Sequence, residues 1–114
     1  MPRFLVTGGA GMIGLEICKQ LSSLGHQVNL FDLGEQIKRV EKFIPKKNIK
    51  TFNGSIIDPS ALRDAMKECE IVIHLAALLG VKRSEENKLK CLEINVEGTK
   101  NVFNTSIERR VKKF

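Results

Sequence analysis

The eight residues Thr7-Gly8-Gly9-Ala10-Gly11-Met12-Ile13-Gly14 decide the fold. They lie between a strand predicted over Arg3–Val6 and an amphipathic helix predicted from Met12 to Leu24. A glycine-rich turn that follows a strand and opens a helix is the arrangement that binds the phosphates of a nucleotide. The stretch therefore predicts an α/β fold with a phosphate site at its first turn.

Each glycine of this turn has a distinct expected role. Gly8 allows the tight bend out of the strand, Gly11 lets the backbone approach a pyrophosphate, and Gly14 permits close packing of the helix on the sheet. The helix begins at Met12 and Ile13 with free N–H groups and the positive end of its dipole, which favour phosphate. We therefore expect these five residues to hold the pyrophosphate of a dinucleotide.

The carboxylate of Asp32 is expected to select the dinucleotide. It ends a strand predicted over Gln27–Phe31, eighteen residues beyond Gly14, where it can accept hydrogen bonds from both ribose hydroxyls of the adenosine. This favours NAD over NADP, whose 2′-phosphate the carboxylate would repel. Two alternatives stay open: Asp32 could cap the turn that follows it, and the cations Lys38 and Arg39 could partly accommodate a phosphate.

Strand and helix patterns alternate along the whole chain, which is typical of a parallel α/β sheet. Further strands are predicted at 49–52 and 70–75, and Val111–Phe114 resembles the start of a fifth strand. We expect residues 1–114 to form one Rossmann-type, doubly wound sheet with strand order 3-2-1-4, truncated at the start of strand five.

The predicted helices are amphipathic. Gly25 should end the first helix, whose stripe toward the sheet is Ile13, Ile17, Leu21 and Leu24. A short helix carries Ile37, Val40 and Phe43 and stops at Pro45, and another begins at Asp58-Pro59 with an N-cap residue and a proline in its first turn. A long helix over 86–109 has apolar residues along one side, namely Leu89, Leu92, Val96, Thr99, Val102, Phe103 and Ile107.

Composition narrows the class of protein. With 42% hydrophobic and 28% charged residues the chain is an ordinary globular sequence, and it has neither a signal segment nor an apolar run of membrane-spanning length, so we expect a cytoplasmic protein without membrane contact. The net charge of +6 could indicate nucleic acid, but the cations are dispersed and Trp and Tyr are absent, which favours solvated faces. The scattered Cys18, Cys69 and Cys91 predict reduced thiols and no metal site.

Three motifs in order resemble the extended short-chain dehydrogenase/reductases, the branch of NAD-dependent nucleotide-sugar epimerases and dehydratases. The first is the spacing Thr7-Gly8-x-x-Gly11-x-x-Gly14, and the second is His74-Leu75-Ala76-Ala77 after the fourth strand. The third is Asn95-Val96-x-Gly98-Thr99-x-Asn101 on the long helix. The resemblance implies that the backbone of Leu75, Ala76 and Ala77 lines the cofactor, that Asn95 supports the site, and that His74 is structural.

One departure from the family pattern follows the third strand. The family has Gly-Asp, an apolar pair and a second Asp, whereas this chain has Gly54-Ser55-Ile56-Ile57-Asp58. The resemblance implies that Ser55 and Ile56 contact the cofactor, with Ser55 accepting the adenine amino hydrogen bond in place of the family's first Asp. Asp58 matches the second Asp, but a role as helix N-cap is favoured.

A larger departure concerns catalysis. The family uses a Ser or Thr after strand five and a Tyr-x-x-x-Lys, but this chain has no Tyr at all, so we assign no catalytic residue. The resemblance implies the NAD-binding part of a nucleotide-sugar enzyme, and Lys82, Arg83 and Ser84 could face its diphosphate or carboxylate or simply lie in a solvated loop. The alternative is a non-enzymatic nucleotide-binding or interaction module. On either hypothesis an open sheet edge predicts a homo-oligomer.

Overall fold

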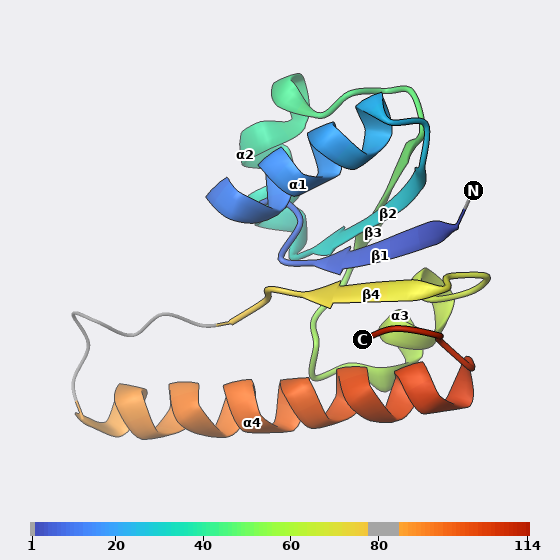
Figure 1. Ribbon diagram of the computed structural model, residues 1–114. Helices are drawn as coiled ribbons and strands as arrows, with labels where there is room; N and C mark the ends of the chain where they lie inside the picture. Colours follow the sequence, from blue (N-terminus) through green and yellow to red (C-terminus); the bar gives the residue numbers. More distant parts are fainter. Residues whose placement is uncertain (1, 78–84) are drawn as a thin grey trace.

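Four parallel strands form one sheet in the order β3-β2-β1-β4 (Figure 1). The computed structural model describes residues 2–77 and 85–114. The strands are β1 (Arg3–Thr7), β2 (Gln27–Asp32), β3 (Ile49–Asn53) and β4 (Ile71–His74). The predicted fold class and strand order are confirmed.

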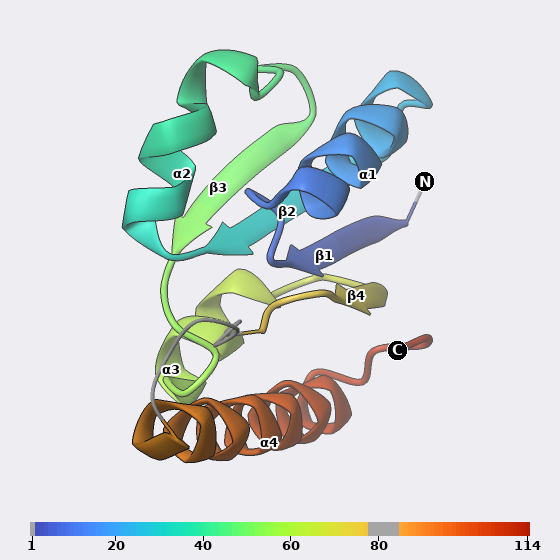
Figure 2. The same ribbon diagram turned by 90° about the vertical axis from the view of Figure 1, so that its left-hand side faces the viewer.

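The helices cover both faces of the sheet. α1 (Met12–Ser23), α2 (Gly34–Val40) and the 3₁₀ turn η1 (Glu41–Phe43) lie on one face, and α3 (Pro59–Ala65) and α4 (Glu85–Glu108) lie on the other (Figures 1 and 2). The sheet grows in opposite directions from β1, so right-handed crossovers place the two sets of helices on opposite faces.

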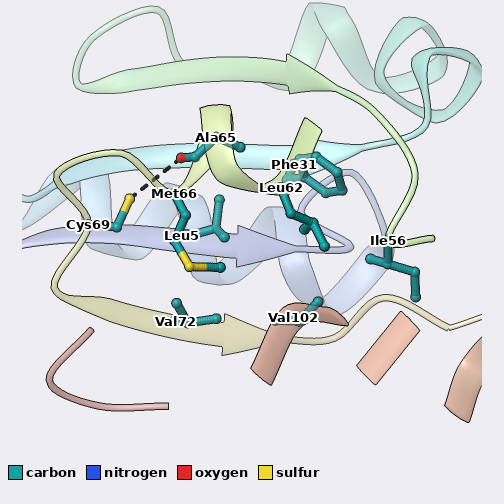
Figure 3. Packing of buried hydrophobic residues seen from close by; sticks show 9 residues of the cluster. All are labelled: Leu5, Phe31, Ile56, Leu62, Ala65, Met66, Cys69, Val72 and Val102. Atoms are coloured by element: carbon teal, nitrogen blue, oxygen red, sulfur yellow. Dashed lines mark hydrogen bonds between the residues drawn. The ribbon is translucent and has the colours of Figure 1, made fainter. Parts of the chain in front are cut away.

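Alternating residues of the strands build one apolar cluster on each face. On β1, the fully buried Leu5 joins the cluster under α3 and α4, whereas the fully buried Val6 joins the cluster under α1 and α2. Figure 3 shows the first cluster, in which Met66 lies beside Leu5, Leu62 lies beside Phe31, and Val102 reaches the cluster from α4. The period of two in a strand therefore divides the core between the two layers of helices.

The first helix ends as expected but faces the sheet differently. Gly25 has a φ of 91°, and the backbone bonds from Gly25 N to Ser22 O (3.0 Å) and from His26 N to Leu21 O (3.1 Å) complete a Schellman motif. The predicted stripe was wrong at both ends, because Ile13 and Leu24 are two-thirds exposed. The buried positions are Gly14, Cys18 and Ser22.

The apolar side of α4 also differs from the expected arrangement. Val102 is fully buried, but five of the other predicted residues are 50–62% exposed, namely Leu89, Leu92, Val96, Phe103 and Ile107. The side that packs on the sheet is instead made of smaller residues, Cys91, Gly98, Thr105 and Ser106. Small residues allow this helix to approach closely, and the larger apolar side chains are left on its outer side. We call these five exposed side chains the α4 stripe.

The residues after α4 pair with β4, as expected for the start of a fifth strand. Ile71 and Lys113 form a parallel bridge, and Val72 N donates to Lys113 O at 2.9 Å. The backbone N–H of Lys112 donates to Glu70 O at 2.7 Å. With so short a neighbour, β4 is only half-buried apart from Val72.

Candidate cofactor site

A cavity of about 510 Å³ lies at the carboxyl ends of β1, β2 and β4 and at the start of α1. The predicted cofactor residues gather there from four separate stretches of chain. Eleven of the twelve line it: Gly8, Gly11, Met12, Ile13, Gly14, Asp32, Ser55, Ile56, Leu75, Ala76 and Ala77. A crevice at the point where a sheet changes its direction of growth is where doubly wound folds bind ligands.

The twelfth predicted residue, Asn95, is half-buried on α4 and does not line the cavity, whereas its neighbour Ile94 does. Sequence reasoning missed the apolar part of the wall, which comprises Phe31, Leu33, Ile57 and Ile94, together with Gln36 and Gly54. Gly54 was within a quoted motif, and a Cβ there would lie 2.8 Å from Ala61 Cβ. Ile57 also belongs to that motif, whereas Phe31, Leu33 and Ile94 carry no local signal, because only the fold brings them to this place.

The glycine turn is held close to two neighbouring strands. Gly8 N and Gly9 N donate to Phe31 O at 2.9 and 3.3 Å, and Gly8 has a φ of 71°. A Cβ on Gly8 would lie 2.8 Å from Ala76 N, so only glycine fits between β1 and the chain after β4. The role expected for Gly14 needs correction, because its missing side chain makes room for the Gly8 carbonyl rather than for the sheet.

The start of α1 presents free backbone donors to the cavity. Its N-cap is Gly11, and no side chain among the described residues caps the helix. A Cβ on Gly11 would meet only Gly8 O, at 3.3 Å, so the backbone here is open to an approaching group. Uncapped N–H groups and the helix dipole favour an anion at this position.

Asp32 connects β2 to the glycine turn. Its Oδ2 accepts from Ala10 N at 3.0 Å, and its Oδ1 accepts from Leu33 N at 2.8 Å. The second bond is the local turn contact that the sequence left open as an alternative. Each carboxylate oxygen keeps a second lone pair, so Asp32 can still accept from ribose hydroxyls in the cavity that it lines.

The wall opposite the glycine turn is fixed by α4. A Cβ on Gly98 would overlap the Ile56 side chain, and Asn101 Nδ2 donates to Ile56 O at 3.1 Å. Ser55 Oγ accepts from Ile57 N at 3.3 Å. The motif on α4 therefore acts on the cavity indirectly, through the position of Ile56.

Asp58 caps α3, as the sequence favoured. Its Oδ1 accepts from Ser60 N at 3.1 Å and from Ala61 N at 3.3 Å, and Pro59 occupies the first turn of the helix. These bonds satisfy two of the helix's free donors. Asp58 is not among the residues that line the cavity.

Thr7 and His74 join the ends of β1 and β4 beside the cavity. Thr7 Oγ1 accepts from Leu75 N at 3.0 Å and from Ala76 N at 3.2 Å, and it lies 2.6 Å from His74 Nδ1. His74 Nε2 lies 3.0 Å from Thr99 Oγ1. Burial lowers the pKa of the His74 imidazole below its ordinary value.

A second cavity, of about 480 Å³, lies at the amino ends of β1, β2 and β3. Its charged lining is mixed in sign, with Arg3, Lys50 and Lys67 beside Asp64 and Glu68. None of the predicted cofactor residues lines it, and its three cationic side chains are partly offset by two carboxylates. The first cavity is therefore the candidate site.

A family model for the 3-beta hydroxysteroid dehydrogenase/isomerase family matches residues 5–114. The chain belongs to this family. Its similarity to the nucleotide-sugar enzymes of the extended short-chain dehydrogenases is also confirmed. The UDP-N-acetyl-alpha-D-glucosaminuronate decarboxylase of Bacillus cytotoxicus is 33% identical over 96% of this chain and 34% of its own length.

Two further relatives of the chain are a steroid dehydrogenase and an epimerase whose structure contains NAD. The 3-beta-hydroxysteroid dehydrogenase of Mycolicibacterium neoaurum is 31% identical over 98% of this chain and 30% of its own. The structure of UDP-glucose-4-epimerase from Stenotrophomonas maltophila contains bound NAD and formylated UDP-arabinopyranose. It superposes on this chain with a TM-score of 0.81 and 27% sequence identity, over 97% of this chain and 35% of the epimerase chain. The chain thus spans about a third of the length of these relatives.

The remaining expectations concern segments beyond the cavity. Lys82, Arg83 and Ser84 lie outside the described residues. In the part of the chain that the structure describes, no helix combines the length and apolar character needed to cross a membrane. Cys18, Cys69 and Cys91 are all free and buried, and burial raises the pKa of the Cys18 thiol to about 12.

Proposed function

We propose that this chain is the NAD-binding part of a nucleotide-sugar epimerase or dehydratase. The observation that carries the proposal is the single cavity that joins the glycine turn, Asp32, Ser55 and the Leu75–Ala77 backbone. Each of these groups suits a different part of a dinucleotide, and they come from four different stretches of chain. The family membership and the NAD in the related epimerase structure support the same assignment.

The residues that line the cavity suit the successive parts of an NAD molecule. The uncapped start of α1 would hold the pyrophosphate, and Asp32 would accept the adenosine ribose hydroxyls. Ser55 and the apolar wall would surround the adenine, while the Leu75–Ala77 backbone would face the nicotinamide half. When bound, NAD would serve as a transient hydride acceptor. The negative charge of Asp32 favours NAD over NADP.

The chemistry on the sugar is assigned to residues outside this chain. The 114 residues contain no Tyr, and the resemblance places proton transfer on a Tyr-x-x-x-Lys. The nucleotide-sugar substrate is proposed from the printed activities of the decarboxylase and the epimerase described above. We therefore assign cofactor binding, and not turnover, to the chain itself.

Calorimetric titration tests the cofactor assignment. The chain should bind NAD more tightly than NADP, because the 2′-phosphate would meet the Asp32 carboxylate. Asp32→Asn should weaken NAD binding by about ten- to a hundredfold, which corresponds to losing hydrogen bonds to a charged acceptor, and should narrow the preference over NADP. Asp64→Asn, an exposed acid on α3, is the matched control and should change neither affinity.

Failure to bind NAD at millimolar concentration, with circular dichroism showing a folded chain, would overturn the cofactor assignment. The enzyme assignment has a separate test in the genomic reading frame. It should continue beyond Phe114 into a strand that bears Ser or Thr and then a Tyr-x-x-x-Lys. A stop codon directly after Phe114 would instead favour the non-enzymatic nucleotide-binding module.

A further inference from the structure

The Thr7 hydroxyl has its hydrogen-bonding roles fixed by its neighbours. Two backbone groups, Leu75 N and Ala76 N, can only donate, and both point at Thr7 Oγ1, at 3.0 and 3.2 Å. The Leu75 N–H is shared with the Thr7 carbonyl at 3.1 Å. A hydroxyl has two acceptor lone pairs and one proton. Both lone pairs are therefore engaged, and the proton must go to the third neighbour, His74 Nδ1, at 2.6 Å.

This assignment determines the tautomer of His74. Nδ1 accepts the Thr7 hydroxyl proton and so carries none of its own. A neutral imidazole then has its proton on Nε2, which lies 3.0 Å from Thr99 Oγ1 and donates to it. One continuous chain of hydrogen bonds thus runs from α4 through β4 to β1 and ends at the backbone of Leu75 and Ala76.

That backbone is a part of the cavity wall with little freedom. Gly8 approaches it so closely that a Cβ there would lie 2.8 Å from Ala76 N and 2.9 Å from the Leu75 carbonyl carbon. A small shift of residues 75 and 76 would therefore change the shape of the glycine turn as well as the wall. The bonds to Thr7 Oγ1 hold this distance.

We infer that Thr99 is a positioning residue, which acts through a neutral, Nε2-protonated His74 to hold the Thr7 hydroxyl against the Leu75–Ala76 backbone of the dinucleotide cavity. The identity of the ligand rests on the function proposed above, but the hydrogen-bond array does not. A second proton on His74 would occupy Nδ1 and leave the Thr7 hydroxyl without its acceptor. The hydroxyl would then have to turn and release a backbone N–H.

Among the described residues, the side chains in contact with the His74 ring are uncharged. The packed neighbours are Thr7 from β1, Thr99 from α4 and the Phe114 ring, whose centroid lies 6.3 Å from that of the imidazole. None of them titrates through its side chain. Burial is the cause of the lowered His74 pKa, and no charged side chain of the described residues contributes to it.

Long-range ¹H–¹⁵N spectra of the imidazoles test the array without any ligand. At about pH 7.5, above the ordinary histidine pKa, His74 Nδ1 should resonate as an unprotonated, pyridine-type nitrogen and Nε2 as a protonated one. Amide hydrogen exchange of Leu75 and Ala76 should accelerate in Thr99→Val and remain at the native rate in Thr99→Ser. A protonated Nδ1, or unchanged exchange in Thr99→Val, would overturn the inference whether or not the chain binds NAD.

Titration with NAD then tests the consequence for the cavity. Thr99→Val should weaken binding by about three- to tenfold, the effect of one hydrogen bond. Thr51→Val, which removes an exposed hydroxyl from β3 outside the cavity, should bind as the native chain does. If NAD binds equally well to both variants, Thr99 does not position the site.

The pH profile separates positioning from general stabilisation. Native NAD affinity should fall as the pH drops through the lowered His74 pKa. His74→Asn retains an oxygen acceptor near the Nδ1 position but cannot titrate, so its affinity should stay level over the same range. Parallel profiles for the two proteins would contradict the role of the imidazole. Absence of NAD binding in every variant, with the predicted tautomer present, would reject the proposed cofactor and leave the array intact.

Discussion

At the scale of single residues, several glycines of this protein lie where neighbouring atoms leave no room for a side chain. Gly98 lies on α4, yet its absent Cβ decides where Ile56 of the cavity wall can lie. The same is true at Gly14, where the absent Cβ leaves room for a backbone carbonyl. Such positions are sensitive because a close-packed interior does not absorb an extra methyl group easily.

Gly98→Ala should lower the free energy of unfolding by about 1–3 kcal/mol, although alanine is the better helix former, because its methyl group would overlap the Ile56 side chain. Shortening that side chain with Ile56→Val should remove the overlapping Cδ1 and restore part of the loss. Urea denaturation of both single variants and the double variant measures this coupling. Strictly additive losses would show that the two residues do not compete for the same space.

Stability should also depend on the protonation of His74. Its pKa in the folded chain is lower than its ordinary value of 6.5, so between these two pKa values the unfolded chain binds more protons. The free energy of unfolding should therefore be highest above this window and fall as the pH drops through it. Urea denaturation from about pH 8 to about pH 5 should give a steeper loss for the native chain than for His74→Asn. Identical slopes would contradict a lowered pKa.

At the scale of elements, two helix ends followed from local chemistry. The Schellman motif at Gly25 and the Asp58-Pro59 cap are formed by residues adjacent in sequence, and sequence reasoning identified both. The side on which a helix packs depends on distant partners. Helical periodicity therefore placed Ile13 and Leu24 toward the sheet, whereas the structure buries Gly14 and Cys18.

In the candidate site, too, contiguous motifs could be found from the sequence, whereas contacts between distant residues could not. The glycine turn, Asp32 and the Leu75–Ala77 segment were each found from the local sequence, and all of them line one cavity. The apolar wall residue Ile94 and the bond from Asn101 to Ile56 depend on how α4 crosses the sheet. No periodic pattern encodes that crossing.

Removing the α3 cap tests one of these local features. Asp58→Ala should lower the free energy of unfolding by about 0.5–2 kcal/mol, because the N–H groups of Ser60 and Ala61 would lose their acceptor. Asp64→Ala, at an exposed position later in the same helix, is the control for the loss of a carboxylate. Thermal or urea denaturation gives both values. Equal losses would mean that the cap contributes nothing specific.

At the scale of the whole molecule, the inner and outer sides of α4 differ in how well their apolar residues are buried. The residues of the cluster under α3 and α4 are buried, but the side chains of the α4 stripe are 50–62% exposed. Phe103 has one aromatic neighbour, Phe114, with ring centroids 5.6 Å apart. A line of exposed apolar side chains of this length favours association with another surface.

The expected homo-oligomer can be tested on this stripe. Sedimentation of the native chain should give a species larger than the monomer, and Val96→Glu should shift it toward the monomer by placing a charge in the α4 stripe. Asn104→Glu introduces the same charge at an exposed polar position of α4 and should leave the distribution unchanged. A native chain that is monomeric at about 100 μM would contradict the expectation, since a homodimer with a Kd of about 1 μM would be mostly assembled at that concentration.

The position of β1 has a consequence for how the protein is made. β1 leaves the ribosome before β2, β3 and β4, yet it lies in the middle of the sheet, and its Thr7 pairs with His74 of β4. The backbone edge of β1 at Leu5 and Val6, which pairs with Val72 and Ile73 in the finished fold, therefore stays unpaired until β4 has been synthesised. A pause in translation between β2 and β4 prolongs this state, during which a chaperone or a second nascent chain can reach the unpaired edge.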